Sequence, residues 1–284
     1  MEVSKMEKTI TLSMLEAFEQ YLIQDEKSKS TIEKYMRDIK HFWEYASERY
    51  VDKILTVAYK SELEKGYAVT SANSMLASLN SFLRFVGWSD LCVKQFKVQK
   101  KTYCPEEKEL SKGEYLRLIK AAESKENERL SLVIQTICGT GIRVSELQFI
   151  TVEAVQRGEA TVCCKGKIRE IFIVSALRKK LLKYARKQKI QSGMIFITKT
   201  GKALNRSNIW REMKALCKQA DVSPDKVFPH NLRHLFARTF YGIEKDIAKL
   251  ADILGHSNIN TTRIYIISTG TEHRRRLESM RLII

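Results

Sequence analysis

Six side chains in the second half of the chain have the chemical types that transfer of a phosphodiester requires. Such a reaction needs a nucleophile in line with the phosphorus, donors that absorb charge on the non-bridging oxygens, and an acid for the departing oxygen. Tyrosine can act as the nucleophile, arginine forks bind phosphate oxygens, and lysine or histidine can transfer a proton. These side chains are Arg143, Lys165, His230, Arg233, His256 and Tyr265.

Two pairs of residues have the spacing of one helical turn. His230 and Arg233 are three positions apart, so on a helix both can address one phosphate. Glu146 follows Arg143 by the same interval and could hold the arginine guanidinium in place. We expect Glu146 to support the arginine rather than to transfer a proton; an ordinary surface ion pair is the alternative.

The order and spacing of four motifs resemble the tyrosine recombinase family, also called the phage integrase family. The motifs are Thr140-Gly141-Ile142-Arg143-Val144-Ser145-Glu146-Leu147, Lys165-Gly166-Lys167-Ile168-Arg169, His230-Asn231-Leu232-Arg233-His234, and Leu254-Gly255-His256 followed nine positions later by Tyr265. The match covers about residues 104–284. The family's arginine, lysine, His-x-x-Arg, histidine and tyrosine set is present at every position.

The resemblance implies a role for each of these residues. Tyr265 would attack the phosphorus and form a 3′-phosphotyrosine link with a free 5′ hydroxyl. The bond energy is kept in that link, so the reaction needs no ATP, metal or other cofactor. Arg143 and Arg233 would clamp the phosphate oxygens in place of a metal ion. His230 is a candidate base or hydrogen-bond partner, and His256 is a candidate donor to the same phosphate.

Two lysines of one turn compete for the role of the acid. Lys165 matches the family lysine that protonates the leaving 5′ oxygen. Lys167 lies two positions away and is the alternative, because a tight turn could present either ammonium group. We expect Lys167 and Arg169 to contact DNA phosphates.

A zinc site is the competing interpretation of the histidine motif. His230 and His234 have the i,i+4 spacing of a helical metal pair. A metalloprotease helix would carry glutamate beside the first histidine, where this chain has Asn231, and zinc would need a further ligand. We therefore expect no metal.

The net charge points to a polyanionic partner. The chain has 50 Lys and Arg against 33 Asp and Glu, a formal charge of +17. Residues 1–103 hold 16 basic and 14 acidic side chains, whereas residues 104–284 hold 34 and 19. The excess positive charge therefore lies with the candidate chemistry, as expected for a protein that binds DNA; the charge alone fits RNA, an anionic lipid or a ribosomal partner equally.

The predicted fold is mainly α with a small β-sheet, in two domains. The apolar pattern of residues 1–92 predicts a helical bundle. The resemblance implies that this bundle is the core-site DNA-binding domain. Residues 93–109 predict a basic linker that can follow DNA phosphates. Residues 110–284 predict a mixed α/β catalytic domain whose tail, 271–284, is exchanged between protomers in the family.

Local signals place the elements of these domains. Ser30-x-x-Glu33 and Ser111-x-x-Glu114 predict capping boxes, the second opening a helical pattern through Ile137. Branched residues around a Lys165-Gly166-Lys167 turn predict a hairpin over 159–174. A short strand is expected at Met194–Thr198. Further helices are predicted at about 176–189, 206–220, 230–241, 244–254 and 260–267.

The expected function is site-specific DNA recombination. The protein would bind double-stranded DNA with inverted half-sites as a homodimer and join two sites as a homotetramer. No run approaches the ~18 apolar residues of a membrane span, so we expect a cytoplasmic protein without a membrane partner. A type IB topoisomerase and a non-catalytic DNA-binding relative are the alternatives. Integration, excision and resolution are all compatible with these motifs.

Overall fold

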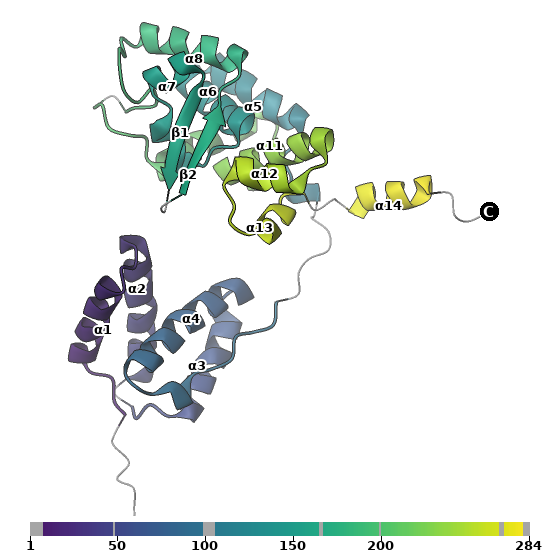
Figure 1. Cartoon of the computed structure of the whole chain (residues 1–284). Helices are drawn as coiled ribbons and strands as arrows, with labels where there is room; N and C mark the ends of the chain where they lie inside the picture. The colour runs from purple at the N-terminus through teal and green to yellow at the C-terminus, as the bar shows by residue number, and fades with distance from the viewer. Residues whose placement is uncertain are drawn as a thin grey trace, which may run out of the picture. The chain divides into compact units, whose positions relative to one another are not determined.

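The computed structural model describes residues 8–47, 49–98, 106–164, 167–198, 200–266 and 270–280. The chain forms two compact units, Met1–Lys100 and Lys101–Ile284 (Figure 1). The described residues are mainly helical, with one two-stranded sheet in the second unit. The predicted fold class is therefore confirmed. None of the described helices combines the length and apolar composition needed to cross a membrane.

The first unit, in its described part, is a bundle of four helices around one apolar core. The elements are α1 (Leu12–Gln24), α2 (Lys29–Ala46), α3 (Lys53–Gly66), α4 (Val69–Phe85) and the 3₁₀ turn η1 (Ser89–Leu91). Phe18 and Phe82 are fully buried and meet edge to face at its centre. The Asn80 side chain makes two hydrogen bonds to the backbone of Val93, of 2.8 and 2.9 Å. The first residue of the predicted linker is thus held against α4.

The capping box predicted at Ser30-x-x-Glu33 is wrong. Helix α2 begins at Lys29, after the N-cap residue Ser28, so Ser30 already lies inside the helix. The Ser28 hydroxyl is hydrogen-bonded to the hydroxyl groups of Ser30 and Thr31, at 3.2 and 2.8 Å. A second serine two positions earlier therefore takes the cap position.

In the second unit, helices both precede and follow a β-hairpin along the chain. Its described elements are η2 (Glu106–Lys108), α5 (Lys112–Ser124), α6 (Glu128–Thr140), η3 (Val144–Phe149), α7 (Val152–Arg157), β1 (Glu159–Cys164), β2 (Lys167–Phe172), α8 (Ser175–Lys187), α9 (Arg206–Lys214), α10 (Cys217–Ala220), η4 (Pro224–Lys226), α11 (Pro229–Glu244), α12 (Ile247–Leu254), α13 (Ile259–Arg263) and α14 (Gly270–Ser279). Strands β1 and β2 pair antiparallel, from Glu159 opposite Phe172 to Cys164 opposite Lys167. The predicted hairpin is present.

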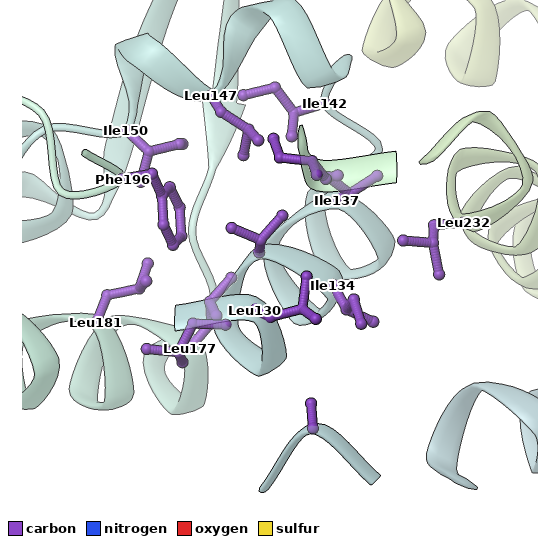
Figure 2. Packing of buried hydrophobic residues seen from close by; sticks show 14 of the residues in the cluster. Leu130, Ile134, Ile137, Ile142, Leu147, Ile150, Leu177, Leu181, Phe196 and Leu232 are labelled. Carbon is purple, nitrogen blue, oxygen red and sulfur yellow. The ribbon is translucent and has the colours of Figure 1, made fainter. Parts of the chain in front are cut away.

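Helix α6 is the centre of the core of this unit. Its buried side chains pack with residues of the following segment, of α8 and α11, and of the segment between α8 and α9. Figure 2 shows this for Leu130, Ile134, Ile137, Ile142, Leu147, Ile150, Leu177, Leu181, Phe196 and Leu232. Both faces of α6 are therefore enclosed by protein. This packing fixes the C-terminal end of α6 beside α11, the helix that carries His230 and Arg233.

Three local predictions for the second unit have different outcomes. The Ser111–Glu114 capping box is confirmed, with reciprocal bonds of 3.2 and 2.7 Å. The helical pattern that follows is divided between α5 and α6, because Asn127 caps a new helix by accepting from Leu130 N. The strand predicted at Met194–Thr198 is wrong, since Met194 and Ile197 make only isolated bridges to different segments.

Candidate active site

The buried guanidinium of Arg233 connects the ends of two helices. The side chain extends from α11, and the residue is 1% exposed. It donates to the carbonyl of Gly141 at the end of α6, and to that of Leu254 at the end of α12 at 2.5 Å. Helix C-termini carry partial negative charge, so they are suitable partners for a buried cation. Arg143 and His256 each follow one of these two helix ends.

Arg233 stays cationic despite its burial. Burial and then the charge of Arg143 lower its pKa, interaction with Tyr265 opposes both, and the resulting pKa is about 10. Among the described residues, its Nε has no hydrogen-bond partner. A buried donor without an acceptor is unfavourable by about 1–3 kcal/mol. An anionic ligand that supplied an oxygen there would remove this cost.

Glycines are required where the two helices end. Gly141 and Gly255 are the C-cap residues of α6 and α12, with φ of +65° and +64°, in the left-handed region that favours glycine. A Cβ at Gly141 would lie 2.5 Å from the Phe236 ring, and one at Gly255 would lie 2.6 Å from Cδ of Arg169. The backbone can therefore turn sharply into the site from both helices.

Glu146 joins two arginines from different elements. Its carboxylate accepts the backbone N–H of Arg143 at 2.8 Å and the guanidinium of that residue at 2.9 Å. It also accepts from Arg169 on β2 at 2.5 Å. The spacing expected of a helical pair is present, although the turn is the 3₁₀ helix η3. Glu146 is 1% exposed and is thus no surface ion pair.

The protonation of Glu146 follows from these contacts. Burial raises its pKa, but the Arg143 backbone N–H and the charges of Arg169 and Arg143 outweigh that effect. The resulting pKa lies below the usual value for glutamate, so the group is a carboxylate at neutral pH. Its negative charge keeps the two cations close together.

His256 is a neutral hydrogen-bond acceptor in this structure. Burial and the charges of Arg233 and Arg143 lower its pKa to about 4. Its Nε2 lies 3.1 Å from Nη2 of Arg233, and arginine has donors only. The proton of the neutral ring is therefore on Nδ1, which lies 2.9 Å from Oγ1 of Thr262. The expected donor role would require His256 to gain a proton.

Tyr265 is enclosed by imidazole rings and apolar side chains. It follows α13 and is 6% exposed. Its ring centroid lies 5.2 Å from those of His230 and His256 and 4.2 Å from that of His234. The pKa of His230 is lowered by burial and then by Arg233, so this ring too favours the neutral form. Three imidazoles thus surround the candidate nucleophile.

Two cavities meet at Arg143. The first, of about 650 Å³, is lined by Ile142, Arg143, Val144, Ser145, Arg206, Ser207, Trp210, Arg211, Phe228, Pro229, His230 and Arg233. The second, of about 740 Å³, is lined by Arg143, Ser145, Glu146, Val162, Ile168, Arg169, Asp252, Gly255, His256 and Ser257. Both cavities share Ser145 as well. The candidate arginines and histidines therefore line adjoining space that is open to a ligand.

Helix α9 contributes a wall of the first cavity that the sequence motifs did not predict. Arg206 and Trp210 are four positions apart and so share one helix face, and Arg206 is among the charges that lower the pKa of His230. This i,i+4 pairing of a cation with an indole was available in the sequence. Nothing in the sequence placed it beside the histidine motif.

The structure brings together five of the six predicted residues. Lys165 lies outside the described residues, as does the side chain of Lys167, so the choice between them stays a prediction. Arg169 is 10% exposed in its side chain, and it binds Glu146 and the carbonyl of Ile253. Its predicted phosphate contact also stays a prediction. Its contacts within the protein give it a structural role.

The metal alternative has little support in the geometry. The rings of His230 and His234 meet edge to face at 4.9 Å. In the described part of the chain, these histidines belong to no cluster of three or more potential His, Cys, Asp or Glu ligands.

Comparison with known proteins gives matches over both units. The model of the phage integrase family matches residues 108–272, and that of the phage integrase N-terminal SAM-like domain matches residues 15–89. Tyrosine recombinase XerA of Pyrococcus furiosus is 30% identical over 284 residues, covering 98% of this chain and 97% of the relative. Tyrosine recombinase XerD of Halalkalibacterium halodurans is 28% identical over 274 residues, covering 87% and 90%.

Solved structures share the fold. A lambda integrase dimer bound to a COC′ core site has a TM-score of 0.75 at 20% identity, covering 92% of this chain and 96% of that one. The post-cleavage complex of XerH with a palindromic difH substrate has a TM-score of 0.74 at 19% identity, covering 96% and 84%.

The Glu146 network gives a stability prediction. Glu146→Gln removes the buried negative charge between Arg143 and Arg169, so the free energy of unfolding should fall by about 3–5 kcal/mol in urea titrations. Glu212→Gln is the matched control, because it removes a carboxylate of a more exposed ion pair with Arg129. It should cost at most about 1 kcal/mol. Equal losses in the two variants would contradict this account of the network.

Proposed function

This chain belongs to the phage integrase family of tyrosine recombinases and is a site-specific DNA recombinase, and we propose that Tyr265 is its nucleophile. Attack by the phenol oxygen on phosphorus would form a 3′-phosphotyrosine bond as the bond to the 5′ oxygen breaks. The observation that carries this proposal is the enclosure of Tyr265 by His230 and His256 beside two arginines. Rejoining is the reverse reaction, in which a 5′ hydroxyl attacks the phosphotyrosine.

Arg143 and Arg233 would bind the non-bridging oxygens of the scissile phosphate. Both line the same cavity together with His230. The Nε of Arg233, which has no hydrogen-bond partner among the described residues, and the 36% exposed side chain of Arg143 leave donors for an incoming phosphate. Because Glu146 and the helix ends already hold these guanidinium groups, little reorganisation is needed when charge develops in the transition state.

Neutral His230 is suited to remove the phenol proton. A phenol attacks only if its anion is stabilised or its proton is taken as the bond forms. His256 has its Nε2 lone pair directed at Arg233, and His230 favours the neutral form. His230 can therefore accept the proton, and a bound phosphate would favour the protonated form of that ring. The one lone pair of neutral His256 is already engaged by Arg233. Lys165, with Lys167 as alternative, would protonate the leaving 5′ oxygen.

The α9 face offers a place for DNA next to the scissile phosphate. Arg206 and Arg211 add positive charge to the cavity wall, and Trp210 adds an apolar surface. Cations there would neutralise adjacent phosphates, so binding should weaken as salt increases. Residues 1–92 would contact the same DNA, with the linker at 93–109 following its backbone.

We also propose the assembly expected from the sequence. A homodimer would bind inverted half-sites, and a homotetramer would join two sites, in the cytoplasm where its DNA lies. The solved relatives include a lambda integrase tetramer bound to a Holliday junction. Leu277 on α14 and Met280, the residue that follows Ser279, are 54% and 55% exposed. Such apolar side chains support docking of the tail at 271–284 on a neighbouring protomer.

A nicked suicide substrate tests the nucleophile. With a candidate site from DNA flanking the gene, the wild-type protein should form a covalent adduct visible on a denaturing gel. Tyr265→Phe should bind the same DNA and form no adduct, because the attacking oxygen is gone. Tyr241→Phe is the control, since it removes a phenol oxygen from the same apolar cluster outside the proposed chemistry.

Two results would contradict the proposal. An adduct formed by Tyr265→Phe would place the nucleophile elsewhere. Relaxation of any supercoiled plasmid, without a defined crossover site, would favour a type IB topoisomerase.

Removal of the tail tests the assembly. Deletion of residues 271–284 should leave binding to a single site intact and abolish tetrameric synapsis and strand exchange, because the exchanged segment is lost. Sedimentation of the protein–DNA complexes and a recombination assay measure both effects. Unchanged synapsis and exchange in the truncated protein would show that the tail is not needed.

A further inference from the structure

His234 lies against the ring of Tyr265 and has no place in the six-residue set. Its ring centroid is 4.2 Å from that of Tyr265, with the two planes inclined by 19°, which is a stacked arrangement. The same imidazole meets His230 edge to face at 4.9 Å. Helix α11 thus carries His230 and, one turn later, His234, and both rings lie against Tyr265.

The geometry separates His234 from proton transfer. In a stacked pair the ring faces meet, so the nitrogens of His234 lie in a plane nearly parallel to the phenol instead of pointing at its oxygen. His234 is also neutral at physiological pH, because burial and then the charges of His230 and Arg233 lower its pKa to about 4. The contact is therefore one of neutral flat rings.

The position of Tyr265 in the chain explains why such a contact matters. The tyrosine follows α13, a helix of five residues, and its backbone N–H bonds to the carbonyl of Thr262 at 3.0 Å. A short helix constrains a side chain weakly by itself. The ring is held by neighbours from other elements, which include Leu250 and Leu254 as well as the imidazoles.

We propose that His234 is a positioning residue that holds the Tyr265 ring in the orientation from which its hydroxyl attacks phosphorus. The inference rests on the proposed role of Tyr265. In-line attack tolerates little displacement, and a shift of about 1 Å can reduce a rate about 10²-fold. A flat ring on the phenol face blocks rotation of Tyr265 about its side-chain bonds while leaving its hydroxyl edge free.

Two substitutions separate positioning from packing. His234→Phe keeps a flat ring, whereas His234→Leu keeps apolar volume without one. On the nicked suicide substrate, single-turnover cleavage by His234→Leu should fall about 10- to 100-fold. DNA binding should not change, and His234→Phe should recover most of the rate. The pH profile of His234→Phe should keep the wild-type shape, because His234 moves no proton.

A readout without DNA covers the case in which His234→Leu folds poorly. With 3-fluorotyrosine at position 265, the ¹⁹F resonance of His234→Phe should stay sharp, while His234→Met should shift and broaden it as the ring gains freedom. Phe149→Leu, which removes a ring packed against the main core of the same unit, controls for general destabilisation. It should leave this resonance unchanged.

The outcomes are distinguishable. Wild-type cleavage by His234→Leu would overturn the inference. Loss of a titration step in His234→Phe would also overturn it, because the imidazole would then transfer a proton. An adduct formed by Tyr265→Phe would refute the role of Tyr265 itself and not the ring contact, which the ¹⁹F resonance would still report.

Discussion

The burial of one positive charge, that of Arg233, organises the catalytic unit. A guanidinium taken out of water is strongly unfavourable unless its donors are satisfied. Here the partners are the carbonyls at the ends of α6 and α12 and a ring nitrogen of His256. The same bonds that make the buried charge tolerable therefore fix where the chain leaves both helices. Arg143 and His256 are placed by that constraint.

Glu146 extends this arrangement to the β-hairpin. By binding Arg143 and Arg169 with one buried carboxylate, it links η3 to β2, and Arg169 in turn reaches the end of α12 through Ile253. The described site thus holds more positive than negative charge, and its histidines are neutral. Such a site favours a phosphate, which supplies negative charge and accepts the remaining donors.

The sequence predicted the type of reaction and the fold class better than the exact positions of the helices and strands. The Ser111–Glu114 box and the hairpin depend on residues close in sequence, so local rules were sufficient. The Ser30 box fails for a local reason, because Ser28 already occupies the N-cap position of α2. The strand at Met194–Thr198 fails for a tertiary reason, because in the described part of the chain it makes only isolated bridges, to Thr151 and Ala203. The split of one predicted helix into α5 and α6 required a cap at Asn127 that periodicity does not reveal.

Within the site, sequence order identified residue types but no contacts. The sequence suggested His234 only as one half of a possible metal pair with His230. The fold places it on the face of Tyr265. The sequence predicted Arg169 as a phosphate contact. Its hydrogen bond to Glu146 depends on how the hairpin packs on η3 and α12. Arg206 and Trp210 could not be predicted as part of the site, because they lie outside the four motifs in sequence and only the fold brings them to the same cavity.

The central claim is that Arg143 and Arg233 neutralise charge on one phosphate. It is tested most directly by single-turnover cleavage of a suicide substrate whose scissile phosphate is replaced by an uncharged methylphosphonate. Arg143→Ala and Arg233→Ala should each lose about 10²-fold or more on normal DNA. Each should lose far less on the methylphosphonate, and that residual activity also shows that the variant is folded. Equal losses on both substrates would contradict the claim.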